Sequence, residues 1–240
     1  ITSGDPAWTG LRALDTYFET QPLPHVGSWY AHHLPEWVAR AGTGATLFVE
    51  LIVPFFIFLP RRFRLVAAAV TILWQLLIIA TSNHNFINLL TIALCLFLFD
   101  DRALRRVWPF REHPGTSPGT REAGPSGRWV PAHWFIGLSA AVIFAASSAL
   151  LWGLATQQRL PHAVNQAVNT VRAFGLTQRY HVFPTIRTDR LEVEIQGSAD
   201  GLRWRPYGFR YKPGDPAMPP AFIVPHQPRL DWMMWFVTLS

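Results

Sequence analysis

The chain has 240 residues, of which 50% are hydrophobic and only 15% are charged, whereas a soluble domain usually carries about 25% charged residues. The 17 Phe and 11 Trp exclude an intrinsically disordered chain, and Cys95, as the only cysteine, excludes an internal disulfide. The net charge of +6 comes from basic residues that mostly flank apolar runs or lie in the last third of the chain. The composition therefore predicts a membrane protein and no nucleic-acid partner.

Residues 1–42 contain two candidate helices ahead of the first apolar block. Asp5-Pro6 predicts an N-cap followed by proline at the first helical position, and a second helix is expected to begin at Ser28 and to carry His32 and His33. Adjacent histidines on a helix point about 100° apart, which is poor spacing for a metal. We expect non-cytoplasmic interfacial helices here, with no metal or cofactor.

Four apolar blocks follow, and they decide the fold class. A helix needs about 20 residues to cross a hydrocarbon core of about 30 Å, and flanking arginines and polar caps extend the two short middle blocks. The alternative is a buried hairpin of a soluble protein, but four such blocks favour a multi-pass α-helical membrane protein. The predicted spans are residues 43–60, 65–82, 85–99 and 133–155.

The charges of the connecting loops predict the orientation in the membrane. Residues 61–64 contain three arginines and the loop 100–132 contains six, while the turn at 81–85 has no Arg or Lys. The positive-inside rule then places both Arg-bearing loops in the cytoplasm. Residues 1–42, the turn, and everything after 156 are expected on the opposite side. Pro and Gly predict that the loop 100–132 is a flexible connection.

Glu50 lies within the first apolar block, where a carboxylate is costly and is expected to have a function or a partner. The sequence offers His84, Gln75, Asn88 or a helix terminus as partners, and the alternative is a protonated Glu50 that only bonds a neighbouring helix. Gln75 and Asn88 are better explained as interhelical hydrogen-bonding residues. Pro54 predicts a kink that frees the Glu50 carbonyl.

Residues 156–240 are predicted to form an extramembrane β-rich module, of the β-sandwich or jelly-roll kind. Residues 190–197 alternate between apolar and polar side chains, as a half-buried strand does. The segment 198–201 ends in the turn pair Asp-Gly, and Pro206 then interrupts a second aromatic alternation, which favours a bulge or an edge strand.

The segment 222–240 is rich in aromatic residues and methionine. One interpretation is an exposed surface that holds an apolar client protein. The other is ordinary packing, with Arg229 and Asp231 as a local ion pair. The candidate client-binding residues are Arg229, Asp231, Trp232, Trp235 and Phe236.

Six stretches of the chain resemble the lipase maturation factor family. The resemblance implies a multi-pass protein of the endoplasmic reticulum membrane with a large luminal C-terminal region. It implies assistance to the folding of secreted lipases into active homodimers, without lipase activity or catalytic residues in this chain. The stretches are SGDPAW (3–8), residues 14–38, ELIVPFFIFLPRRFR (50–64), residues 85–101, residues 194–215 and PHQPRLDWMMWF (225–236).

Two other hypotheses stay open beside this one. The first is a membrane enzyme or lipid-handling protein built around Glu50, His32, His33 and His84, although the chain has no common catalytic motif. The second is a structural subunit of a membrane complex. The expected partners are a secreted lipase and membrane lipid. An Arg-rich, Lys-poor composition also allows a bacterial inner membrane, and both chain ends lead us to expect a piece of a longer protein.

Overall fold

A computed structural model describes residues 4–107, 131–178, 185–215 and 217–238. These residues form two compact units. The first unit contains residues 4–107 and the C-terminal residues from 185 onward, and the second contains residues 131–178.

Helices make up most of the first unit, and its strands are short. The helices are α1 (Pro6–Thr9), α2 (Ala13–Thr20), α3 (Val26–His32), α4 (Glu36–Leu51), the 3₁₀ helix η1 (Val53–Phe58), α5 (Arg61–Thr81), α6 (Ile87–Leu96), α7 (Asp101–Val107) and α10 (Arg229–Val237); the strands are β1 (Gln196–Gly197) and β2 (Arg205–Pro206).

Three helical segments of the described residues are long and apolar enough to cross a membrane: Glu36–Phe58, Arg61–Thr81 and His133–Thr156. These correspond to the first, second and fourth predicted blocks and make the chain a helical membrane protein. The third block instead forms α6, an apolar helix of only 10 residues. At 1.5 Å per residue, α6 alone covers about 15 Å, half of a typical hydrocarbon core.

The first span changes helix type at the position predicted to kink. Regular α4 ends at Leu51, and η1 continues from Val53 with Pro54 in its first turn. Proline has no N–H group to donate to the Glu50 carbonyl, so the regular hydrogen-bond ladder stops there. Val49 and Val53 then pack against Ala67 of α5, and this cluster joins the two spans.

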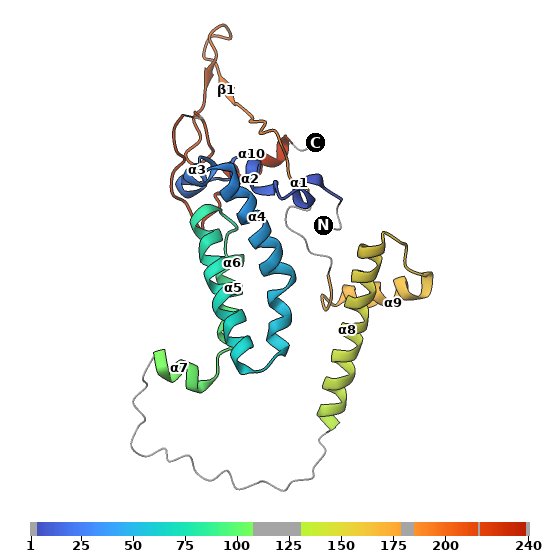
Figure 1. Cartoon of the computed structure of the whole chain (residues 1–240). Coiled ribbons are helices and arrows are strands. Elements are labelled where there is room, and N and C mark those ends of the chain that lie inside the picture. Colours follow the sequence, from blue (N-terminus) through green and yellow to red (C-terminus); the bar gives the residue numbers. More distant parts are fainter. Residues whose placement is uncertain (1–3, 108–130, 179–184, 216, 239–240) are drawn as a thin grey trace, which may run out of the picture. The chain divides into compact units, whose positions relative to one another are not determined.

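α5 and α6 lie side by side and share a polar pair inside an otherwise apolar contact (Figure 1). The Asn88 side-chain amide donates a hydrogen bond of 2.6 Å to Gln75, as predicted for an interhelical pair. Past α6, Asp100 forms an ion pair with Arg61 at the opposite end of α5. The segment 82–100 therefore runs the length of α5, although only part of it is helical.

The helices α1, α2, α3 and α10 gather at the end of the bundle where α4 begins and α5 ends, while α7 follows the other end (Figure 1). Asp5 caps α1 as predicted, because its carboxylate accepts a hydrogen bond of 2.7 Å from the Ala7 N–H. α3 begins at Val26, earlier than predicted, because His25 is its N-cap and Ser28 completes a capping box.

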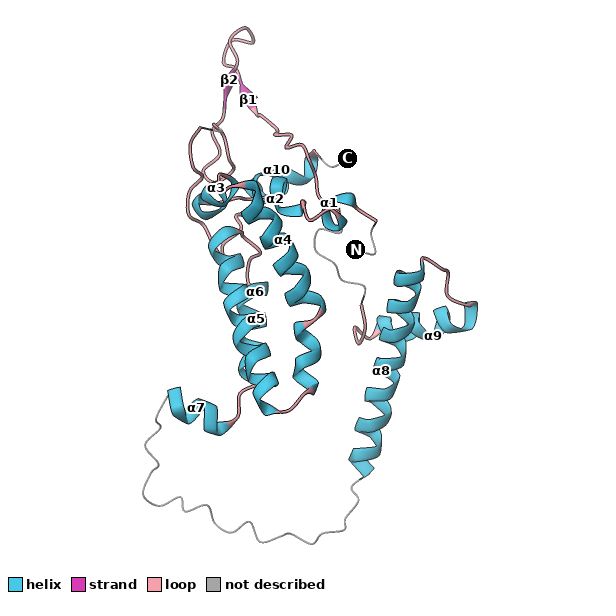
Figure 2. Ribbon diagram, viewed as in Figure 1, coloured by secondary structure: helices cyan, strands magenta, loops and turns pink. Residues whose placement is uncertain are grey.

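The C-terminal part of the first unit contains little β-structure (Figure 2). One antiparallel ladder pairs Gln196 with Pro206 and Gly197 with Arg205, and this ladder alone supports the predicted β-rich module. Leu191 and Ile195, expected to face a core, are 61% and 41% exposed. Alternating side chains specify a strand only where a neighbouring strand takes up its backbone groups, and the described residues supply such a neighbour for two positions.

The second unit consists of α8 (Pro131–Thr156) and α9 (His162–Ala173), and α9 falls where β-structure was expected. Val168 of α9 is buried against Ala146 and Leu150 of α8, and the hydroxyls of Ser147 and Thr177 are 3.0 Å apart. The loop predicted at 100–132 begins with α7; its residues 108–130, with three of the predicted loop arginines, lie outside the described residues.

Candidate functional site

Polar side chains are buried where the membrane bundle of the first unit meets the C-terminal segment. We call this cluster the polar junction. Buried polar groups are costly unless hydrogen bonds satisfy them, so their partners show what the cluster holds together. Its buried members are Tyr17, Gln21, His25, Ser28 and Asn83, and the half-buried His84 belongs to it through its bond with Tyr17.

Asn83, in the turn between α5 and α6, joins three separate parts of the chain. Its backbone N–H donates a hydrogen bond of 3.2 Å to the Gln21 side chain, and its side-chain amide donates one of 3.0 Å to the His226 carbonyl. The Asn83 carbonyl accepts a bond of 2.8 Å from the Gln227 side chain. One membrane turn therefore fixes both α2 and the C-terminal segment.

His25 anchors α3 against the end of α5. Its Nδ1 accepts a hydrogen bond of 3.1 Å from the Gly27 N–H, and the His25 N–H donates to the Ser28 hydroxyl. Burial lowers the pKa of His25, although backbone hydrogen bonds to Ser82 and Ile79 act in the opposite direction. Since Nδ1 acts as an acceptor, the ring is neutral and carries its proton on Nε2.

Tyr17 and His84 form a short hydrogen bond between α2 and the turn after α5. Burial raises the pKa of Tyr17, while a side-chain hydrogen bond with Ser82 acts in the opposite direction. Burial lowers the pKa of His84 to about 4. At neutral pH both groups are uncharged, so the contact is a neutral hydrogen bond rather than an acid–base pair.

Arg190 attaches the C-terminal segment to the end of α2. Arg190 donates a hydrogen bond of 2.6 Å to the Gln21 carbonyl, just past the last turn of α2, and lies 2.6 Å from the Glu192 carboxylate. Lys212 lies 2.7 Å from the same carboxylate. A helix C-terminus leaves carbonyls without intrahelical partners, so the Arg190 guanidinium satisfies one group and tethers two segments at once.

The predicted client-binding residues divide between the two faces of α10. Asp231 is buried and accepts hydrogen bonds of 2.9 Å from the N–H groups of Tyr211 and Lys212, so it ties down a loop instead of pairing with Arg229. Trp235 donates a bond of 2.9 Å from its indole N–H to the Thr20 carbonyl.

The outward face of α10 is apolar. Leu230, Met233 and Val237 are 63%, 44% and 52% exposed, and their spacing places them on one side of the helix. Phe236, another predicted residue, is exposed next to them. Trp232 is half-buried and packs against Phe236, with ring centroids 4.6 Å apart.

The structure does not bring the four residues of the predicted Glu–His site together. Glu50 is exposed near the end of α4. It lies about 21 Å along the helix axis from Glu36, and the histidines are at the Glu36 end of the bundle. His32 lies 3.8 Å from Glu19, and His33 bonds the Trp29 carbonyl of its own helix. Among the described residues, no three His, Cys, Asp or Glu side chains are grouped closely enough to hold a metal.

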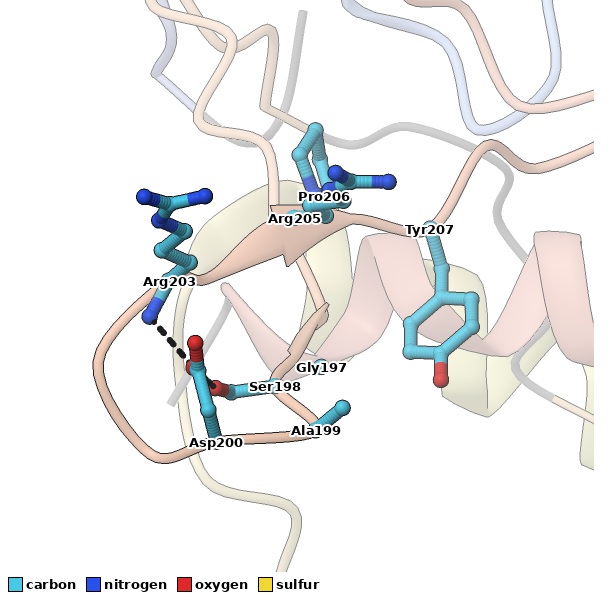
Figure 3. A pocket seen from close by; sticks show the side chains of 8 residues that line it. All are labelled: Gly197, Ser198, Ala199, Asp200, Arg203, Arg205, Pro206 and Tyr207. Carbon is cyan, nitrogen blue, oxygen red and sulfur yellow. Dashed lines mark hydrogen bonds between the residues drawn. The ribbon is translucent and has the colours of Figure 1, made fainter.

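A hollow of about 580 Å³ lies beside the β1–β2 ladder. Figure 3 shows its lining, where Asp200 accepts a hydrogen bond from the Arg203 N–H. The Leu202 N–H donates to the same carboxylate oxygen. These bonds, with that of the Ser198 hydroxyl, hold the pKa of Asp200 below its usual value. The carboxylate is therefore used within its own turn. The lining residues are Gly197, Ser198, Ala199, Asp200, Arg203, Arg205, Pro206 and Tyr207.

Comparison with known protein families identifies the two parts of the chain that meet at the polar junction. Residues 1–106 match the lipase maturation factor transmembrane domain, and residues 176–240 match the lipase maturation factor C-terminal domain. The chain belongs to the lipase maturation factor family. The polar junction thus lies where residues of the family's two domains meet, and the resemblance predicted from the sequence is confirmed.

Named relatives agree along the full chain. It is 34% identical to lipase maturation factor 1 of Homo sapiens over 99% of its residues, 35% identical to that of Bos taurus over 99%, and 30% identical to lipase maturation factor 2 of Rattus norvegicus over 100%. The aligned part is 43%, 44% and 47% of those proteins, so the chain spans less than half of their length. No solved structure matches the chain significantly.

Of the residues that build the junction in this member of the lipase maturation factor family, the sequence singled out only His84 as a candidate site residue, and only in connection with Glu50. The sequence places Asn83 in a polar turn and Arg190 on the polar face of an alternating segment, and neither pattern predicts a partner for these residues. Gln21 carried no local signal. The one available sign was a group of uncharged polar residues at 81–85 beside an apolar span, because such residues must find partners once the turn is covered.

Proposed function

We propose that this protein is a membrane-anchored maturation factor that assists the folding and homodimer assembly of a secreted lipase. The observation that carries the proposal is the family match, because the relatives that align along the full chain are named lipase maturation factors. The protein is proposed to act in the endoplasmic reticulum membrane, where lipases on the secretory pathway fold.

The proposed orientation places the polar junction in the lumen. Contacts of Asn83 with Gln21, His226 and Gln227 keep α2, the turn after α5 and the C-terminal segment at one end of the bundle. The arginines of residues 61–64 and 102–106 lie toward the other end, next to the Arg61–Asp100 ion pair, which agrees with a cytoplasmic location. We take the segment 85–99 as the return crossing between these ends.

The outward face of α10 is the proposed contact for the lipase. It combines Leu230, Met233, Phe236 and Val237, and methionine-containing apolar surfaces adapt to different partners. Asp231 and Trp235 hold the opposite face of the helix to the rest of the unit. A firmly attached helix with an exposed apolar face suits a factor that shields apolar lipase surface until the dimer forms.

Point substitutions test this better than a deletion of residues 222–240, which would also remove the contacts of Asp231 and Trp235. The double variant Leu230→Ser/Met233→Ser changes only exposed side chains. In cells without an endogenous family member, co-expressing one secreted lipase, we expect several-fold less lipase activity per secreted lipase molecule. The level and melting temperature of the membrane protein should stay unchanged.

The matched control is Leu191→Ser, which removes an exposed leucine elsewhere in the C-terminal segment and should leave the secreted lipase activity unchanged. Equal lipase activity with the double variant and the unmodified protein would exclude the α10 face as the contact. If the unmodified protein adds no lipase activity over an empty vector, the maturation function itself is excluded.

The enzyme or lipid-handling hypothesis has no comparable support. It required Glu50 and the three histidines in one site, and the fold separates Glu50 from them. The hydrogen bonds of Tyr17 with His84 and of Trp29 with His33 account for two of these histidines as structural residues.

A further inference from the structure

The ion pair between Arg61 and Asp100 unites two basic segments that are far apart in the sequence. Residues 61–64 contain three arginines at the start of α5, and residues 102–106 contain three more in α7. Asp100 also caps α7, because its carboxylate accepts a hydrogen bond of 2.9 Å from the Ala103 N–H. The fold thus places six arginines around one end of the bundle, and we call this set the arginine collar.

In residues 61–64 and 100–106 the arginines outnumber the carboxylates by six to two. Asp100 is engaged by Arg61, which leaves Asp101 as the other carboxylate of the two segments. Pro60 precedes α5 and provides no side-chain cap, and the first turn of α5 contains no acidic residue. The positive end of the α5 dipole therefore adds to the charge of the arginines instead of opposing it.

Exposed aromatic rings indicate where the arginine collar lies relative to the hydrocarbon core of the membrane. Phe58, at the end of η1, is 86% exposed, and Phe97, just after α6, is 87% exposed. Such rings are costly in water but stable in lipid. Arg62 stacks over the ring of Phe63, with its guanidinium carbon 5.0 Å from the ring centroid. Apolar rings next to a band of arginines correspond to the boundary between acyl chains and headgroups.

We propose that the arginine collar binds the phosphate groups of anionic phospholipids. Arg62, Arg102 and Arg106 are exposed at the end of the bundle, and guanidinium groups bind phosphate oxygens through paired hydrogen bonds. Leu104 on α7 is exposed as well and would enter the acyl region while the arginines face the headgroups. The lipids would hold α7 on the membrane surface. They would also stabilise the contact between the start of α5 and the start of α7 that the Arg61–Asp100 pair makes.

The test uses the full-length protein in nanodiscs of phosphatidylcholine that contain a minority of phosphatidylglycerol. Native mass spectrometry measures which lipids stay bound when the nanodisc is removed. We expect phosphatidylglycerol to be retained over phosphatidylcholine by about fivefold or more relative to its share of the nanodisc. The variant Arg62→Gln/Arg102→Gln/Arg106→Gln should lose this preference, and the corresponding triple lysine variant should keep most of it.

The matched control removes three exposed arginines from the other end of the unit, Arg12→Gln/Arg40→Gln/Arg229→Gln, and should retain the lipid preference. Melting temperatures check that the variants are folded; we expect them to be, because the Arg61–Asp100 pair is intact in each. An equal loss in both glutamine triples would overturn the proposal, as would the absence of any preference in the unmodified protein. Inorganic phosphate that displaces the lipid at millimolar concentration would also overturn it, since the collar would then bind free anions.

Discussion

Gly27 shows how much a single residue decides at the polar junction. A Cβ atom at this position would lie 1.8 Å from the Ala80 carbonyl oxygen and 2.7 Å from the His25 ring. α3 therefore approaches the C-terminal end of α5 through a contact that only glycine permits. The obstacle is backbone in the last turn of a membrane-spanning helix, so it cannot rotate away as a side chain would.

We expect Gly27→Ala to lower the free energy of unfolding by about 2–3 kcal/mol, at the upper end of the usual cost of overpacking. Thermal unfolding of the detergent-solubilised protein measures the effect. Gly44→Ala is the control, because its added Cβ has no atom within 4 Å and alanine is favoured over glycine in a helix by about 1 kcal/mol. A melting temperature of Gly27→Ala equal to or above that of the unmodified protein would contradict the packing described here.

His84 makes the junction sensitive to acid. Its pKa of about 4 in the folded protein lies below the ordinary value of 6.5, so between these values the unfolded chain binds a proton that the folded chain does not. The contribution of His84 to stability is full well above pH 6.5 and falls as the pH drops toward 4, with a slope of at most about 1.4 kcal/mol per pH unit. His84→Gln, which can still bond Tyr17, should lose less stability between about pH 7.5 and pH 5.

Melting temperatures at the two pH values provide the readout for this prediction. His33→Gln replaces an exposed histidine and should lose as much stability on acidification as the unmodified protein. Some sensitivity should persist in His84→Gln, because burial also lowers the pKa of His25. If His84→Gln and His33→Gln respond alike, His84 is not the residue responsible.

Between elements, distant tethers matter more here than regular secondary structure. The described residues after 185 form one ladder of two residue pairs. Arg190, Asp231 and Trp235 nevertheless fix this segment to α2 and to its own loops. The side chain of Arg190 is only 10% exposed, and a buried charge with several partners is expensive to disrupt. This segment therefore depends on a few side chains more than on a sheet.

Arg190→Ala should accordingly cost about 3 kcal/mol of stability, because Glu192 and the Gln21 carbonyl lose a buried partner. The segment 185–215 should also become cleavable by protease while the membrane bundle stays intact. Arg12→Ala breaks ion pairs whose arginine is 61% exposed and should cost less than about 1 kcal/mol. Unfolding and limited proteolysis of the two purified variants distinguish a buried tether from a surface ion pair.

For the whole molecule, the proposed orientation has a direct test. Cys95 is the only cysteine, so Cys95→Ala gives a background without thiols. In sealed vesicles, a membrane-impermeant maleimide should label Ser198→Cys and Ser117→Cys from opposite sides, and detergent should expose both. Labelling of both positions from the same side would mean that the two loops are not separated by the membrane as proposed.

Much of the fold could be predicted, because its signals lie in short contiguous stretches of the sequence. Apolar length indicated the long spans, Asp5-Pro6 predicted a capped helix, and Pro54 predicted the end of regular α4. The misses lie where local pattern and environment disagree. The alternating sequence at 190–197 pairs with another strand only at its end. The amphipathic α9 lies among residues that the sequence assigned to a β-rich module.

The sequence by itself determined that this is a helical membrane protein of the lipase maturation factor family, because hydrophobic length and family motifs are properties of contiguous residues. Only the tertiary structure decided which polar groups meet. Asn83 bonds residues 62 and 143 positions away, and Trp235 bonds a carbonyl 215 positions away. Partners at such separations leave no periodic pattern in the chain, because the meeting of their elements depends on how the membrane helices pack and where each of them ends.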